Sequence, residues 1–239
     1  MLLETVATSV QSALHAEKAG AHRIELCSEL AVGGVSPSYG LIQQVLKRTS
    51  IPVFVLIRPR SGNFVYSDEE FEIIKKDIQL CKDLGCAGIV SGVLNADNSI
   101  DLKRTKELIE LSKPLEFTFH RAFDLTENPI RSLEELMDLG ADRVLTSGQK
   151  NSAELGLELL IELKNVAQNK IGILPGGGIH PGNVHLFKEN GFTEIHASAS
   201  SVYQENPSPK ISFVSEKFLD ETKLFVSDEQ IIKELVDQL

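Results

Sequence analysis

The most constraining feature of this 239-residue sequence is one pattern that repeats from end to end: a short apolar run, a loop and an amphipathic stretch. Strands that alternate with helices predict a parallel sheet with right-handed crossovers. Eight such units in about 240 residues have the size of a closed barrel. We therefore predict an α/β fold, a single (β/α)8 TIM barrel, with strands at residues 2–6, 23–27, 52–58, 87–93, 115–119, 142–146, 171–174 and 193–197.

An open doubly wound sheet is the alternative to the barrel. Its first turn would carry the sequence G-x-G-x-x-G directly after the first strand. Residues 9–19 stand at that position instead, with the apolar spacing of a helix and without such a turn. The barrel is therefore the favoured prediction.

The chain shows no linker or change of composition before Val202. We predict a barrel domain over residues 1–201 and a C-terminal helical extension over 202–239 that packs on the barrel. The extension is polar at 204–209 and ends in an amphipathic helix over 228–239. That helix is the last helix of the barrel, a flap over one mouth, or an oligomer contact, and we expect a homo-oligomer.

The charge balance limits the classes of partner. The net charge is −10, which argues against nucleic acid or an anionic membrane as the main partner. No apolar run approaches the ~20 residues of a membrane span, and the N-terminus lacks the pattern of a secretory signal. Three widely spaced cysteines do not form a disulfide framework. These features predict a cytoplasmic protein with reduced thiols.

Polar side chains gather where the predicted strands end. The strand at 115–119 leads directly into His120, Arg121 and Asp124, and a charged cluster at the end of an apolar strand is costly to bury. It either lines a cavity or ties a loop to the barrel rim. Several other strands end in the same way, whereas the strand starts and middles are mostly Val, Ile, Leu and Phe. Because barrels of this type carry function at the carboxyl ends of their strands, we predict a functional site there.

An anion-binding site is the first hypothesis for this end of the barrel. A glycine run after the seventh strand and a serine after the eighth lie where many barrels hold a phosphate with backbone N–H groups. Arginines could add charge-assisted hydrogen bonds, and the alternative is a run of glycines that only forms a tight turn. Glu25 and His120 are the candidate proton-transfer, and hence catalytic, residues. The candidate anion-binding residues are Arg58, Arg60, Arg121, Ser147, Gly176, Gly177, Gly178 and Ser198.

A metal site is the second hypothesis. The carboxylates of Glu4 and Glu25 with the imidazoles of His120 and His196 could hold a divalent ion. The alternative is that these carboxylates pair with Arg58 and Arg121. Cys27 offers a thiolate that suits Cu(I), whereas Cys81 and Cys86 are five residues apart and fit small core positions.

Several motifs together resemble the CutC family of copper homeostasis proteins. They are residues 23–27 (RIELC), 33–40 (GGVSPSYG), 57–60 (IRPR), 118–124 (TFHRAFD), 143–148 (RVLTSG) and 176–179 (GGGI). They occur in order over residues 1–200. The resemblance implies a TIM barrel, a cytoplasmic location and a role in copper homeostasis, and it implies no particular reaction.

The resemblance also suggests a copper site. Cys27 stands where the family has a proposed Cu(I) ligand, and Cys27, His120 and His196 are the candidate metal ligands. This sequence departs from the family in the loop after the third strand, where Val65 replaces a common cysteine and Asn63 a common aspartate. This departure leaves Cys27 without that soft partner and weakens the case for copper. The function that the resemblance implies is nevertheless copper homeostasis, with copper ion binding. The alternative is a TIM-barrel enzyme or binding protein for a small anionic metabolite, phosphorylated or carboxylated.

Overall fold

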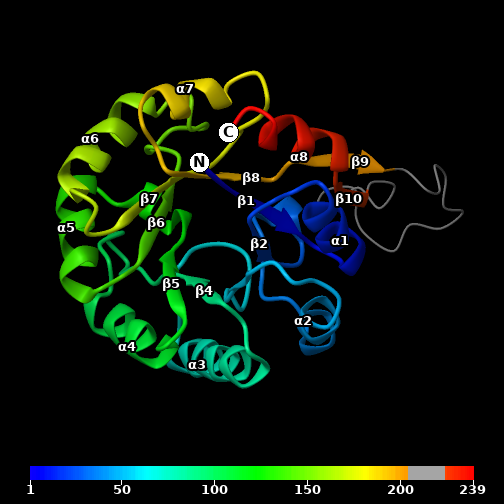
Figure 1. Cartoon of the computed structure of the whole chain (residues 1–239). Helices are drawn as coiled ribbons and strands as arrows, with labels where there is room; N and C mark the ends of the chain where they lie inside the picture. The colour runs from blue at the N-terminus through cyan, green and yellow to red at the C-terminus, as the bar shows by residue number, and fades with distance from the viewer. Residues whose placement is uncertain (204–223) are drawn as a thin grey trace, which may run out of the picture.

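The computed structural model describes residues 1–203 and 224–239. Eight parallel strands form a barrel that is ringed by helices, which confirms the predicted fold (Figure 1). The strands are β1 Leu2–Ala7, β2 Arg23–Leu26, β3 Val53–Leu56, β4 Gly88–Ser91, β5 Glu116–Phe119, β6 Arg143–Thr146, β7 Gly172–Pro175 and β8 Glu194–Ala197. Each predicted strand overlaps its observed counterpart, with differences of a few residues at the ends.

The barrel closes between the seventh and eighth strands, which are the two ends of the sheet. The order of neighbours is β7-β6-β5-β4-β3-β2-β1-β8, and the bridge between Gly176 and His196 joins the two ends of this sheet. A Cβ atom at Gly176 would lie 2.5 Å from the Leu145 side chain and 3.2 Å from that of His196. Glycine therefore allows the seventh strand to approach the barrel interior at this seam.

Helix ends follow their sequence signals. Ser67 and Glu70 form a capping box at the start of the third helix, and Gly85 and Gly140 end helices with φ of +80°. The predicted helix over 129–139 has the observed bounds. The first seven helices are α1 Val10–Lys18, α2 Tyr39–Leu46, α3 Asp68–Leu84, α4 Leu102–Ser112, α5 Pro129–Leu139, α6 Leu157–Ala167 and α7 Val184–Glu189.

The C-terminal segment supplies the eighth helix of the ring, so the first of the three predicted roles is the observed one. Helix α8, Glu229–Val236, lies beside α1 and α7 (Figure 1), with an ion pair from Lys18 to Glu229 and a hydrogen bond from Lys188 to the Gln238 carbonyl. Two short strands that the sequence did not indicate, β9 Ser200–Tyr203 and β10 Leu224–Ser227, pair antiparallel before it. The polar stretch 204–209 lies outside the described residues.

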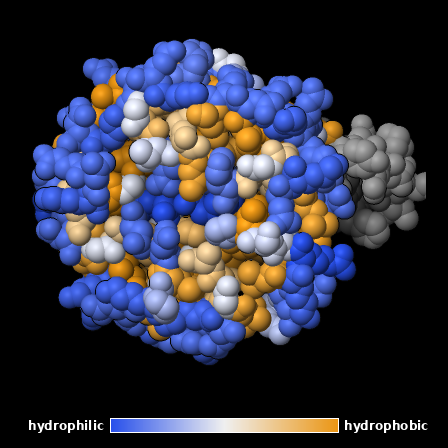
Figure 2. Space-filling view, viewed as in Figure 1, coloured by the Kyte–Doolittle hydropathy of each residue, from blue (hydrophilic) through white to orange (hydrophobic). Residues whose placement is uncertain are grey.

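The apolar core has two parts. The larger part lies between the sheet and the helices, and the smaller one fills the inside of the barrel with Val6, Cys27, Phe54, Leu56 and Val90. In the view of Figure 2, hydrophilic residues cover the outer rim and a small hydrophilic group lies at the centre, bordered by hydrophobic residues. None of the helices in the described residues is long and apolar enough to cross a membrane.

The prediction that strand starts and middles are mostly apolar was wrong for the barrel interior. Glu4, Arg23, Arg143 and Glu194 lie within strands and are at least nine-tenths buried. They form ion pairs with one another, and we call them the paired layer. Burying these groups is possible because each charge meets an opposite charge.

Candidate functional site

A cavity of about 200 Å³ opens at the carboxyl ends of the strands, and we call it the mouth cavity. It is smaller than the ~300–1,000 Å³ of sites for drug-sized ligands. Four residues of the predicted anion and metal sites, Glu25, Arg58, His120 and His196, all line it. So do Val6, Cys27, Leu30, Gly33, Leu56, Phe64, Arg121, Leu145, Gly177, Gly178 and Ser198.

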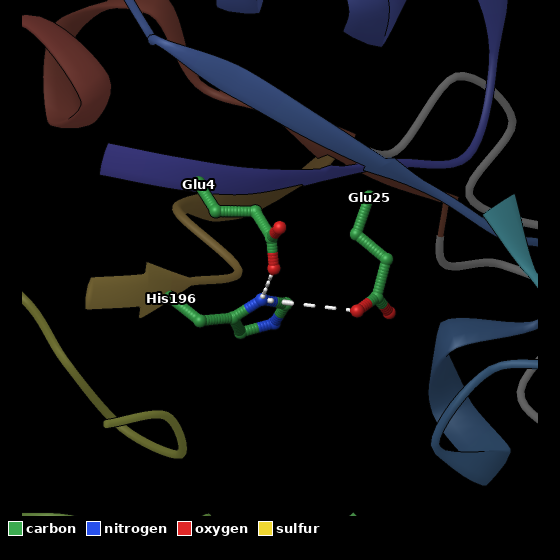
Figure 3. A group of neighbouring side chains, drawn as sticks. All are labelled: Glu4, Glu25 and His196. Carbon is green, nitrogen blue, oxygen red and sulfur yellow. Dashed lines mark hydrogen bonds and ion pairs between the residues drawn. The ribbon is translucent and has the colours of Figure 1, made fainter. Parts of the chain in front are cut away.

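His196 lies between two carboxylates at the floor of the mouth cavity (Figure 3). Its Nδ1 is 2.7 Å from Oε1 of Glu4 and 3.9 Å from Oε2 of Glu25. One ligand atom from each of the three residues lies within 4.8 Å of the others. Strand register explains this meeting, because Glu4 is paired across the ladder with His196 on β8 and with Arg23 on β2.

Glu4 connects this cluster to the paired layer. Arg23 donates to Glu4, and its NH2 lies 2.9 Å from Oε2 of Glu194. Arg143 Nε lies 3.3 Å from the same Glu194 oxygen, and both guanidinium groups lie over the ring of Phe54. Glu4 therefore pairs with Arg23, and the suggested pairing of the carboxylates with Arg58 and Arg121 is not observed.

Sequence reasoning missed Arg23, Arg143 and Glu194. A signal was present for Arg23, because Arg23, Glu25 and Cys27 alternate along one strand and so share a face. That face points into the barrel, since Arg23 lies over the ring of Phe54 and both Glu25 and Cys27 line the mouth cavity. For Arg143 and Glu194, only the register of the strands reveals that they meet.

The two glutamates have opposite electrostatic environments. Burial raises the pKa of Glu4, but the hydrogen bond to His196 and the charge of Arg23 outweigh it and hold that pKa at about 2. Burial and then the charge of Glu4 raise the pKa of Glu25 to about 7, against the opposing effect of His196 and Arg23. Burial lowers the pKa of His196, but the nearby Glu25 and Glu4 raise it overall.

His120 follows β5 and is held in one orientation. The backbone N–H of Ala122 donates to its Nδ1 at 3.3 Å, and the Phe64 ring lies 4.7 Å away. A Cβ atom at Gly92 would lie 2.7 Å from the same nitrogen, so the ring packs directly against that backbone. Burial and the charge of Arg58 lower the pKa of His120 to about 3. The ring is therefore neutral at physiological pH.

Arg58 holds the loops around the mouth cavity. Its NH1 donates to the carbonyls of Val32 and Gly34, and its NH2 donates to that of Gly62. The guanidinium carbon lies 4.9 Å from the centre of the Phe64 ring. These contacts leave its Nε buried without a hydrogen-bond partner among the described residues.

Three buried polar atoms on residues that line the mouth cavity lack a partner in the described part of the chain. They are Nε of Arg58, Oε2 of Glu25 and Nε2 of His120. A buried donor or acceptor left unpaired costs about 1–3 kcal/mol, and such groups in native proteins call for an explanation. A ligand in the cavity would provide it.

The mouth cavity is also lined by the predicted anion-binding residues Arg121, Gly177, Gly178 and Ser198. Arg121 donates through Nε to Asp124 and through NH2 to Ser147. A Cβ atom built on Gly177 would lie 3.4 Å from NH1 of Arg121, so this nitrogen lies over the glycine backbone. The remaining NH1 and the glycine turn thus face the cavity together.

Three other predicted anion-binding residues do not line the cavity. Arg60 pairs with Glu70 at 2.5 Å and donates to the Val65 carbonyl. The Ser147 hydroxyl lies 2.6 Å from the Lys150 carbonyl oxygen and 3.0 Å from an Asp124 oxygen, either of which can accept its one hydrogen, and Gly176 packs against its neighbouring strands at the barrel seam. The structure thus separates these three from the remaining five residues of the predicted set.

Cys27 lies in the cavity wall and is buried. Burial and the nearby Glu25 raise the pKa of its thiol well above the usual range. His120 and His196 line the same cavity, so the three predicted metal ligands share one space. Cys81 and Cys86 are buried in the outer core, as predicted.

Comparisons with known proteins agree with this architecture. The family model of the CutC family matches residues 1–201. A CutC family protein of Photorhabdus laumondii is 46% identical over 200 residues, which cover 84% of this chain and 80% of the relative. The copper homeostasis protein cutC homolog of Homo sapiens is 48% identical over 201 residues, covering 84% and 74% of the two chains.

A solved structure is also similar. The crystal structure of CutC from Streptococcus agalactiae matches with a TM-score of 0.78 and 35% identity, over 83% of this chain and 98% of that one. An aldolase with 15% identity and a TM-score of 0.64 shares the barrel fold alone. From the match of the family model and the identity to these relatives, the chain belongs to the CutC family.

Proposed function

We propose that this protein acts in copper homeostasis, the role that the names of its mammalian relatives state for them, and that the mouth cavity is its working site. We further propose a cytoplasmic location, which the three free and buried cysteines support. The homo-oligomeric state stays a prediction.

The ligand that the geometry favours most is a small polar anion, phosphorylated or carboxylated. The observation that carries this proposal is the set of three unpaired buried atoms, on Arg58, Glu25 and His120, around one cavity. Two are N–H donors, and Arg121 adds a positive charge at the rim. An anion would satisfy donors that otherwise stay unpaired.

The test is a thermal-shift screen with sugar phosphates, carboxylates and divalent ions. A ligand at 100 times its Kd should stabilise the fold by ~2.7 kcal/mol. We expect a phosphate or carboxylate compound to raise the melting temperature, and Arg121→Met to remove the shift. Arg131→Met is the matched control, because Arg131 is exposed on α5 and pairs only locally with Glu135. Equal shifts in the wild type and in Arg121→Met would contradict this site.

Cu(I) is the second candidate ligand. The supporting observation is that a thiol and two imidazoles, from Cys27, His120 and His196, line the same cavity, and Cu(I) accepts both donor types. Cys27 would have to lose its proton on binding, which its raised pKa opposes. The family relationship supports copper, whereas the burial of the thiol predicts weak binding.

A competition titration with a Cu(I) chelator tests this candidate. We expect Cys27→Ser to weaken binding by about tenfold or more, because the hydroxyl is a poor ligand for a soft ion. Cys81→Ser, in the outer core, is the control and should bind Cu(I) as the wild type does. Equal affinity of the wild type and Cys27→Ser would exclude Cys27 as a copper ligand.

A further inference from the structure

The hydrogen bonds of His120 define which ligand atom it can meet. A backbone N–H can only donate, so the bond from Ala122 N makes Nδ1 of His120 an acceptor. The ring proton of this tautomer is then on Nε2, which is buried and unpaired in the described residues. His120 therefore presents a fixed N–H donor that requires an acceptor, such as a carbonyl oxygen.

Packing holds the imidazole ring of His120 in this orientation. Phe64 contacts one face at 4.7 Å between ring centres, and the backbone at Gly92 contacts the edge that carries Nδ1. A catalytic or binding donor is effective when packing fixes its orientation before the ligand arrives. The surroundings of His120 meet this condition.

Glu25 presents the opposite kind of group to the same cavity. Its Oε2 is buried and unpaired, and the nearest partner, Nδ1 of His196, is 3.9 Å away and bonds to Glu4 instead. Glu25 is thus a carboxyl group in contact range of a ligand hydroxyl or of a hydrogen on a carbon atom. The cavity offers an N–H donor and a carboxyl oxygen at the same time.

We infer that the mouth cavity binds a short α-hydroxycarbonyl phosphate, with the carbonyl oxygen on His120, the neighbouring carbon at Glu25 and the phosphate at Arg121 and Gly177. This inference rests on the proposed anion-binding function and names its substrate class. The phosphate position follows from the glycine turn after β7, where barrels of this architecture hold phosphates with backbone N–H groups. The small volume of the cavity limits the chain to a few carbon atoms.

The same arrangement supports proton transfer next to the carbonyl group. Glu25 takes the proton from the carbon, the C–H electron pair forms a C=C bond, and the carbonyl π pair moves onto the oxygen. Nε2–H of His120 stabilises the oxygen anion that forms. Return of the proton to the same carbon restores the starting compound. Return to the former carbonyl carbon, with transfer of the hydroxyl proton to the oxygen anion, gives the isomeric hydroxycarbonyl compound, and neither route needs an oxidant or reductant.

The experiment compares three probes by calorimetry: dihydroxyacetone phosphate, glycerol 3-phosphate, which lacks the carbonyl, and inorganic phosphate. We expect the carbonyl compound to bind about fivefold to tenfold more tightly than glycerol 3-phosphate, the effect of one neutral hydrogen bond. His120→Asn should remove this preference, so that the two compounds bind with the same affinity. His185→Asn, exposed on α7, is the control and should retain the preference.

Proton transfer is measured by proton NMR as exchange of the carbon-bound hydrogens with D2O. The wild type should catalyse exchange, and Glu25→Gln, purified identically, should be slower by about 100-fold or more. Equal affinity for the first two probes would overturn the carbonyl assignment while the anion site stands. Binding without exchange would overturn the catalytic step, and no binding of any probe would overturn both this inference and the anion site. Melting curves of each variant establish that it is folded.

Discussion

The paired layer and the mouth cavity bury similar groups in different ways. In the paired layer, Arg23 bridges two carboxylates, and Arg143 shares one of them, Glu194. Glu25 and His120 are equally buried, but each keeps an atom without a partner in the described residues. Burial alone therefore does not distinguish the two regions. They differ in whether the buried polar atoms have partners, and the proposed ligand would supply those that the mouth cavity lacks.

The largest expected effect comes from breaking the paired layer. Arg23→Met keeps much of the side-chain volume but leaves Glu4 and Glu194 buried without their cation. We expect the free energy of unfolding to fall by about 3–5 kcal/mol in urea titrations. Arg131→Met, which removes an exposed pair on α5, should cost about 0–1 kcal/mol. Similar losses in the two variants would show that the paired layer contributes little to stability.

Ionisation of Glu25 in the mouth cavity should have a smaller effect on the free energy of unfolding, and this effect should depend on pH. The folded pKa of Glu25, about 7, exceeds its ordinary value of 4.5, so between these values the folded chain holds a proton that the unfolded chain has released. Stability should therefore fall as pH rises from about 5 to 8, by about 1–3 kcal/mol. Below pH 4.5 stability should instead fall as pH falls. The pKa of Glu4 is depressed in the folded chain, so the stability that its ionised form contributes declines as pH falls toward 2.

Glu25→Gln isolates this contribution. Urea unfolding at pH 5, 6, 7 and 8 should show a weaker decline in the variant than in the wild type, since an amide has no charge to bury. We expect the variant to be as stable as the wild type, or more so, at pH 8. Parallel pH profiles would mean that Glu25 titrates as an ordinary carboxyl group, and the contrast between the two regions would lose its electrostatic basis.

The smallest expected effect concerns Arg60, which the sequence placed with the site and the structure directs away from it. Arg60→Ala removes a partly exposed pair with Glu70 and should lower stability by about 0.5–1 kcal/mol. Binding of any ligand found in the thermal-shift screen should not change. A loss of ligand binding comparable to that of Arg121→Met would extend the site beyond the mouth cavity.

The sequence predicted the barrel because strand and helix periods alternate clearly, and Gly85 and Gly140 mark helix ends. It also predicted that Glu25, His120 and His196 would approach one another, since the carboxyl ends of parallel strands meet at one edge. It could not predict the paired layer, which depends on the register that places Glu4 beside both β2 and β8. Register is a property of two paired strands, and it cannot be read from the sequence of either strand alone.

Arg58 and Arg60 show a second limit of prediction from the sequence. Both arginines lie in the loop after β3, and the sequence gives no reason to prefer one over the other as an anion-binding residue. In the folded chain, Arg58 turns inward to loop carbonyls and Phe64, whereas Arg60 turns outward to Glu70. The direction of each long side chain is decided by acceptors that come together only after the loop has formed.

The position of α8 has a consequence for the order in which this chain is assembled. Ser227, just before that helix, donates to the carbonyl of Val6 across 221 residues, and the buried Ile232 and Leu235 follow within the helix. The first strand of the barrel thus receives its covering helix from the last of the barrel's segments to be made. Contacts between such distant segments slow folding, because a long loop must close before they form. The surroundings of the strand that carries Glu4 are therefore complete only after α8 has been synthesised.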